Sequence, residues 1–144
     1  MRLTTNGNAI EYRATSIVDA FGALADAVAA IATGARSASV LWGDEPSAML
    51  IEFAAADPDQ IGLVITRLAM PDWLLPQSRP WQPLRGAERL HTLLPRAVAL
   101  RGFRDGLRGV TAQLSDRGTI PGWNHSFPAV ALAAIEAAVP EEKP

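Results

Sequence analysis

The sequence predicts a single α+β domain in which helices pack on an antiparallel sheet of about four strands. Apolar and polar residues alternate over short segments that are typical of strands, and apolar residues recur every three or four positions over longer segments that are typical of helices. The chain has 144 residues, of which 49% are hydrophobic and 19% are charged, which is enough to bury one core. We expect the domain to span residues 8–140 and a frayed tail to occupy 141–144.

The N-terminal third predicts a strand followed by a helix. Residues 8–14 alternate in the manner of a half-buried strand of the sheet. A helix is expected over residues 17–33, with Ser16 as its N-cap and Gly34 in a left-handed conformation at its end. Alanines flank its apolar stripe, so later helices or a second subunit should cover it closely. The stripe consists of Ile17, Phe21, Leu24, Val28 and Ile31.

The middle of the chain predicts a three-stranded antiparallel meander. Its strands are expected over 37–42, 48–55 and 61–68, because the segments 43–46 and 57–59 hold the Asp, Gly and Pro residues that favour turns. The strand face that carries Met49, Ile51 and Phe53 should meet the first helix. Residues 71–86 are rich in proline and tryptophan, which excludes regular structure and indicates a lid or a segment bound over a surface.

Two more helices are expected after this connection. Residues 88–94 predict a short turn, and a helix should begin near Pro95 because Leu100, Phe103, Leu107, Val110 and Leu114 form one stripe. Glycines 102, 106 and 109 interrupt this helix, and each lowers helix stability by about 0.8–1 kcal/mol relative to alanine. We expect them to permit close packing against the alanine-rich first helix. The last helix should begin at Ser126 or Pro128 and end near Val139.

Composition excludes several classes of protein. The chain has no cysteine, so disulfides, thiolate catalysis and cysteine-based metal centres are excluded. No apolar run is long enough to span a bilayer, and the first residues lack the apolar stretch of a secretory signal. We therefore expect a soluble cytoplasmic protein without a membrane partner. Twelve arginines against one lysine, together with abundant alanine, are typical of a GC-rich bacterial genome.

The charges are distributed unevenly along the chain. Residues 1–78 carry four arginines and nine acidic residues, a net charge of −5, whereas 79–117 carry eight arginines and three acidic residues, a net charge of +5. The remaining segment carries one lysine and three acidic residues, so the total is −2. A total near zero argues against a nucleic-acid partner, while the basic segment favours an acidic protein partner.

The usual nucleotide-binding, acyl-transfer and zinc-binding motifs are absent. There is no Gly-x-Ser-x-Gly sequence, no phosphate-binding Gly-x-x-x-x-Gly-Lys sequence and no His-Glu-x-x-His sequence. His91 and His125 lie far apart in the sequence, so a metal site would need ligands from separate segments. We therefore predict no catalytic residue, no cofactor and no metal site, and consider a non-enzymatic protein more plausible than an enzyme.

The predicted binding surface combines the proline-rich connection with the second long helix. Arginines 101, 104 and 108 share one face of that helix, and Asp105 is spaced to pair with Arg101. An arginine face of this kind can recognise an anionic surface. Alternatively, it is an ordinary helix face that contacts only solvent. The connection would contribute Trp73, Arg79 and Trp81.

A pocket is the alternative interpretation. Four tryptophans could wall it, with the connection 71–86 as its lid, and it would then bind or convert a small molecule. The same tryptophans could equally be core residues, and the acidic pair in the turn could serve only to form that turn. Besides Trp73 and Trp81, the pocket residues would be Trp42, Asp44, Glu45, His91, Trp123 and His125.

The segments Trp42–Pro46 and Trp123–Pro128, together with the capped alanine-rich helix, resemble those of small uncharacterised bacterial α+β proteins. Some proteins of that kind serve as immunity partners of secreted toxins. The resemblance implies an interaction protein and transfers no catalytic residue. The sequence therefore predicts a protein that binds another protein or a second copy of itself.

Overall fold

The structure is a computed structural model that describes residues 2–5, 8–11, 19–44, 47–69, 89–120, 122–123 and 125–139. A four-stranded antiparallel sheet of order β3-β4-β5-β6 and the helices that pack on it confirm the α+β class. The strands are β1 (Arg2–Thr5), β2 (Asn8–Glu11), β3 (Ser37–Asp44), β4 (Ser47–Asp57), β5 (Gln60–Ala69) and β6 (Arg89–Pro95), and the helices are α1 (Ala20–Ala32), α2 (Arg96–Thr111) and α3 (Ala129–Ala138).

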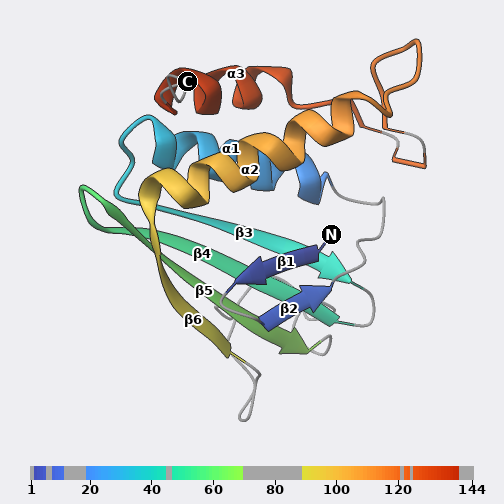
Figure 1. Ribbon diagram of the computed structural model, residues 1–144. Helices are drawn as coiled ribbons and strands as arrows, with labels where there is room; N and C mark the ends of the chain where they lie inside the picture. Colours follow the sequence, from blue (N-terminus) through green and yellow to red (C-terminus); the bar gives the residue numbers. More distant parts are fainter. Residues whose placement is uncertain are drawn as a thin grey trace.

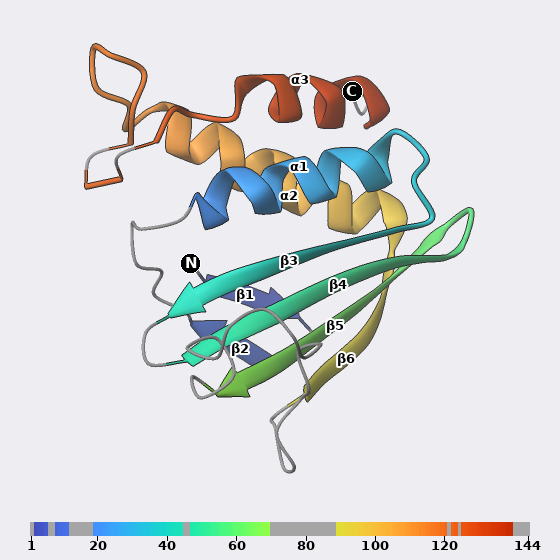
Figure 2. The same ribbon diagram turned by 180° about the vertical axis from the view of Figure 1, so that it is seen from behind.

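The described helices lie together on one face of the four-stranded sheet (Figures 1 and 2). α1 lies over β3 and β4, whereas α2 contacts β5 and β6. α3 packs against α1 and α2 as the layer farthest from the sheet (Figure 1). None of the described helices is long and apolar enough to cross a membrane.

The core lies between the sheet and the helices, on what we call the inner face of the sheet. Strand register places Val40, Ile51 and Ile65 side by side on this face, and all three are buried. Met49 and Phe53 point the same way, as predicted, and the ring of Phe53 meets the edge of Phe103 of α2 at 5.8 Å between centroids. The first helix, which contacts β3 and β4, therefore covers the predicted strand face together with α2.

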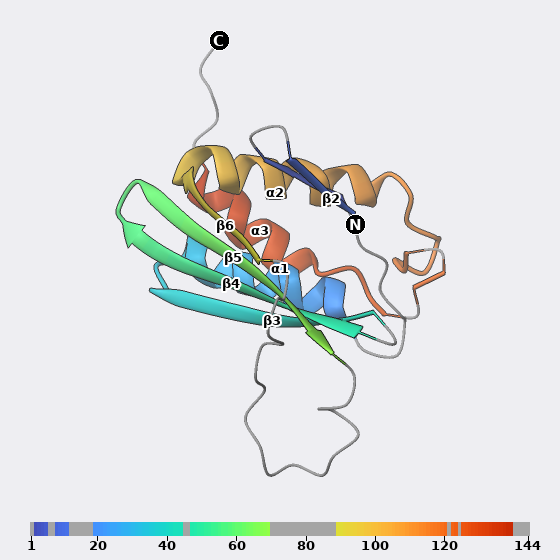
Figure 3. The same ribbon diagram turned by 90° about the horizontal axis from the view of Figure 1, so that it is seen from below.

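The other face of the sheet, the outer face, has no described helix over it (Figure 3). Its residues alternate with those of the inner face. Leu41, Glu52, His91 and Leu93 are exposed there. Glu52 is the only charged residue in the middle of β4, and its exposure shows that this face is solvated there.

Two residues, Asp19 and Gly34, determine where α1 begins and ends. The carboxylate of Asp19 accepts a hydrogen bond from the backbone N–H of Gly22 at 2.8 Å, so α1 begins at Ala20 rather than at residue 17. The predicted cap, Ser16, lies outside the described residues. Gly34 has a φ of 106°, which confirms the left-handed C-terminal residue.

Two predictions about strands were wrong. The sequence predicts a turn over 88–94, but Arg89–Pro95 form the edge strand β6, because Leu90, Thr92 and Leu94 alternate with side chains that face the opposite way. The strand predicted over 8–14 does not join the main sheet. Its described part, β2, pairs instead with β1, a neighbour in sequence whose pairing requires only a short loop to close. Residues 12–14 lie outside the described part of the chain.

The two C-terminal helices begin close to the residues that the sequence predicts. α2 begins at Arg96, directly after Pro95, and ends at Thr111, so Leu114 lies beyond it. α3 begins at Ala129, directly after Pro128. The side chain of Arg96 donates hydrogen bonds from Nη2 to the carbonyl oxygens of Ile31 at 2.6 Å and Ala32 at 3.1 Å, which fastens the start of α2 to the end of α1.

Candidate functional site

The outward side of α2 carries a ridge that is nearly free of side chains. Gly102, Gly106 and Gly109 are exposed and lie at spacings of four and three, so they share one side of the helix. A Cβ atom added at any of them would meet no neighbouring atom within 4 Å. Val98, four residues before Gly102, continues this line and is 53% exposed. We call Val98, Gly102, Gly106 and Gly109 the glycine ridge.

The prediction that these glycines permit close packing against α1 was wrong. α2 turns Leu100, Phe103 and Leu107 toward the core, and the glycine ridge lies on the other side of the helix. The loss of about 0.8–1 kcal/mol per glycine relative to alanine is therefore not offset by packing within the described part of the chain.

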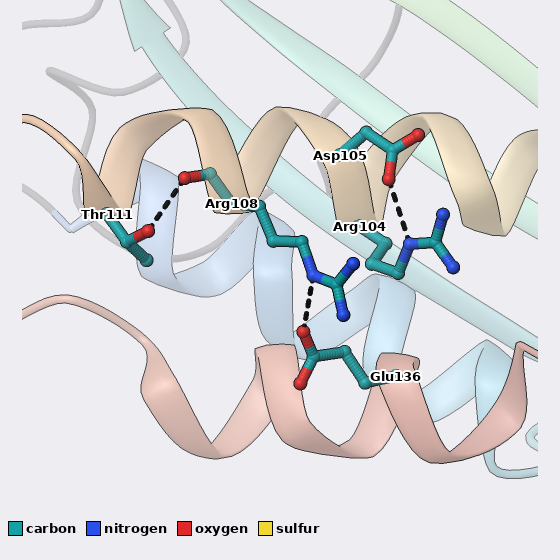
Figure 4. A network of polar contacts seen from close by, with 5 residues as sticks. All are labelled: Arg104, Asp105, Arg108, Thr111 and Glu136. Carbon is teal, nitrogen blue, oxygen red and sulfur yellow. Dashed lines mark hydrogen bonds and ion pairs between the residues drawn. The ribbon is translucent and has the colours of Figure 1, made fainter. Parts of the chain in front are cut away.

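Two of the predicted arginines of α2, Arg104 and Arg108, take part in ion pairs (Figure 4). Nε of Arg108 donates to Oε1 of Glu136 on α3 at 2.6 Å, although the Arg108 side chain is still 51% exposed. Nε of Arg104 donates to Oδ1 of Asp105 at 2.8 Å, and its side chain is only 16% exposed. Asp105 thus accepts a bond from Arg104, and its expected pairing with Arg101 stays a prediction. Arg101 is half-buried.

The aromatic residues predicted to wall a pocket lie in different places. Trp42 is buried on the inner face, and its Nε1 has no acceptor among the described residues. Trp123 donates from Nε1 to Oδ1 of Asp19 at 3.1 Å, and its ring lies 5.8 Å from the ring of His125. His91 is exposed on the outer face of β6, at the opposite edge of the sheet from Trp42. The structure does not bring Trp42 and His91 together.

The other predicted site residues fall where the structure gives no description of their side chains. Trp73, Arg79 and Trp81 of the connection 71–86 lie outside the described residues, as does Glu45. Asp44 is the last residue of β3, and only its backbone is described. The binding role of the connection and its role as a lid therefore stay predictions.

A small apolar cavity of about 10 Å³ lies between the sheet and the helices. Val28 and Ile31 of α1, Phe53 of β4 and Phe103 of α2 are among the residues that line it. This volume is near the lower limit for one water molecule, so the cavity has no room for a substrate. In the described ranges, no three His, Asp or Glu side chains gather in a way that could hold a metal ion.

Replacing Gly22 by alanine is expected to lower the free energy of unfolding by about 1–2 kcal/mol, because the loss of a helix cap has an effect of that size. The new Cβ would overlap the carboxylate of Asp19, whose Cγ lies 2.7 Å from the Cβ position. Displacement of the carboxylate would break its bonds to Gly22 and Trp123. Urea titration measures the change.

Gly106→Ala is the matched control for that substitution. Because a Cβ at Gly106 meets nothing, alanine should raise the free energy of unfolding by about 0.5–1 kcal/mol through helix propensity. The two variants thus carry the same chemical change with opposite expected signs. A stabilising effect at both positions would show that Asp19 leaves its capping position without loss.

Comparison of this chain with protein-family models, with curated proteins and with solved structures finds no match at the required significance. The candidate site therefore rests on the geometry of α2 and its neighbours. The sequence identified the arginines and the glycine spacing, but it missed Glu136, whose pairing with Arg108 depends on how α3 lies beside α2.

Proposed function

We propose that this chain is a non-enzymatic binding protein, which binds another protein through the glycine ridge and the arginines beside it. The observation that carries the proposal is the exposed glycine ridge itself. These glycines lower the stability of α2, although a Cβ atom at any of them would have open space in the described part of the chain. A second protein that lies directly against the helix backbone explains their presence, since small residues permit such close approach.

The charges of α2 indicate an acidic partner. The helix carries four arginines and one aspartate. Arg108 is the most accessible of the paired arginines, and an exposed ion pair such as Arg108–Glu136 contributes only about 0–1 kcal/mol. A carboxylate of a partner can therefore replace Glu136 at small cost. The planar guanidinium group also suits bidentate binding of carboxylates.

The narrower form of the proposal concerns the kind of partner. The resemblance to immunity proteins favours a secreted toxin as the protein that docks on α2. The connection 71–86, with Trp73, Arg79 and Trp81, is the second surface proposed for that contact. The geometry of α2 supports binding of an acidic protein. That this protein is a toxin, and that residues 71–86 also contact it, are additional proposals.

Substitution of Gly106 by glutamine tests the proposal. Glutamine is a good helix former and has open space at this position, so the chain should fold, while its side chain would block approach to the backbone. Ala133→Gln on the exposed side of α3 is the matched control. Tagged chains would be expressed in the organism that encodes them, and the proteins that co-purify would be quantified by mass spectrometry.

We expect a stoichiometric acidic protein to co-purify with the wild type and with Ala133→Gln but not with Gly106→Gln. Its capture should weaken as salt rises, because exposed charges are screened. The proposal is overturned if Gly106→Gln retains the same proteins in the same amounts, or if the wild type retains no stoichiometric partner.

A further inference from the structure

We infer that the free edge of β3 pairs with β3 of a second copy of this chain, so that the two four-stranded sheets become continuous. The inference goes beyond the proposed function, because it names a second copy of this chain as a binding partner. It also uses a different surface, because β3 is the sheet edge opposite to β6, whereas α2 lies over β5 and β6.

The backbone of β3 presents unpaired groups at this edge. The carbonyl of Arg36 accepts a hydrogen bond from the N–H of Ala55 at 2.9 Å. Because bonded residues alternate along an antiparallel pair, the even-numbered residues from 36 to 42 bond to β4. The backbone groups of Ser37, Ser39, Leu41 and Gly43 therefore point to the free edge, and no hydrogen bond joins them to another residue of the described ranges.

The two edges of the sheet differ in composition. Edge strands are commonly protected from pairing by charged residues and by proline. β6 has Arg89 at its start, His91 in its middle and Pro95 at its end. In contrast, residues 37–43 of β3 contain no charge and no proline. Within the described part of the chain, β3 is thus the edge that is open to another strand.

β3 is complementary to itself in one antiparallel register. If the twofold axis passes beside Val40, Ser39 lies opposite Leu41 of the second copy, and Ser37 lies opposite Gly43. All four residues then exchange backbone hydrogen bonds across the axis, since each has its groups at the edge. The same register places Arg36 opposite position 44 of the second copy, which is an aspartate, so opposite charges meet at both ends of the paired strands.

α1 provides further contact area above the seam. Its other sides contact the sheet, α2 and α3, and the remaining side exposes Ala23, Asp26 and Thr33. Figure 2 shows α1 directly above β3 on the near side of the molecule. Small residues on this side let the α1 helices of two copies approach. Asp26 of each copy repels the other, so we expect a dimer of moderate affinity that forms with rising concentration.

Sedimentation equilibrium of the full chain tests the inference. We expect the mass to rise from 15.3 kDa toward twice that value between micromolar and submillimolar concentration. Ser39→Pro should stay monomeric, because its N–H points to the free edge and proline removes that donor. The β3–β4 hydrogen bonds do not use this N–H, so circular dichroism should be unchanged. Ser39→Thr keeps the N–H and should dimerise like the wild type.

Hydrogen exchange on the wild type gives a readout that needs no variant. The amides of Ser39 and Leu41 should exchange slowly at high concentration and fast at low concentration, whereas those of Val40 and Trp42 should stay protected throughout. Reversal of charge at position 36 alone, by Arg36→Asp, should raise the dissociation constant. Addition of Asp44→Arg should restore it.

A wild type that stays monomeric over this range overturns the inference, as does a dimer whose Ser39 and Leu41 amides exchange at the same rate at all concentrations. If the wild type is monomeric but its acidic partner protein is lost upon Gly106→Gln, the proposed function stays intact. Conversely, if the chain forms a dimer with protected edge amides but no partner protein binds α2, the inference is supported and the proposed function is overturned.

Discussion

Replacement of Ile51 by alanine is expected to lower the free energy of unfolding by about 2–5 kcal/mol, the range for removal of a large buried aliphatic side chain. Ile51 lies in β4, an interior strand of the sheet, and its side chain is 0% exposed. Val40 and Ile65 flank it on the neighbouring strands, and both are buried. Rigid strands on both sides prevent the space from closing, so the loss should lie in the upper part of the range.

Glu52→Ala is the control for this prediction, because the next residue along β4 points to the outer face and is exposed. Its effect should stay within about 0.5 kcal/mol. Urea titration followed by far-UV circular dichroism measures both variants, and an unchanged slope would show that the unfolded states are comparable. Equal losses for Ile51→Ala and Glu52→Ala would contradict the assignment of the two sheet faces.

Sequence patterns were sufficient to predict the elements whose signals are local. The stripe from Phe21 to Ile31 and the left-handed Gly34 define α1 because helix period and C-cap geometry depend only on neighbouring residues. The meander β3–β5 was predictable for the same reason. Its second turn is held by Asp57, whose carboxylate accepts a hydrogen bond from the N–H of Asp59 at 2.8 Å, as turn chemistry requires.

The errors concern pairing between segments. The alternation in residues 90–94 is present in the sequence, but a short alternating segment next to a helix start can equally be a turn. Only its register with β5, in which Leu63 lies opposite Thr92, makes it a strand. Similarly, the pattern of β2 predicts a strand and does not say which partner it takes. Strand partners depend on long-range contacts that a single periodicity does not contain.

The glycine ridge shows the same limit at the candidate site. The spacing of Gly102, Gly106 and Gly109 places them on one side of α2 in any interpretation. Which side faces the core is decided by the larger residues Leu100, Phe103 and Leu107. Their positions on the helix were known from the sequence, and they exclude the glycines from the core. The expectation of close packing against α1 was wrong because the glycines lie on the side of α2 opposite to the large residues that pack in the core.

The two proposed surfaces lie on different parts of the fold. The glycine ridge belongs to α2, which lies over β5 and β6, whereas the open edge belongs to β3 beneath α1. A dimer formed through β3 would therefore leave α2 of both copies free for a partner. Such an assembly would present two binding surfaces, and bivalent binding raises apparent affinity when a partner can engage both.

Replacement of Arg96 by methionine is expected to lower the free energy of unfolding by about 1.5–3 kcal/mol, the range for hydrogen bonds that involve a charged group. Nη2 of Arg96 bonds the carbonyls of Ile31 and Ala32 at the C-terminal end of α1. The last turn of α1 has no basic residue of its own. Arg96 therefore supplies the positive charge that stabilises the negative end of this helix, and it joins α1 to the start of α2.

Arg108→Met provides the comparison for Arg96→Met, because it is the same change on the same helix. The Arg108 side chain is 51% exposed and its ion pair with Glu136 lies at the surface, so its loss should lower stability by only about 0–1 kcal/mol. Arg96→Lys should fall between the two, since lysine keeps the charge and loses the planar group. Equal losses for the two methionine variants would mean that the bonds to α1 contribute no more than a surface ion pair. The expected order instead assigns Arg96 the role of fastening α1 to α2, and thereby of holding the glycine ridge in place.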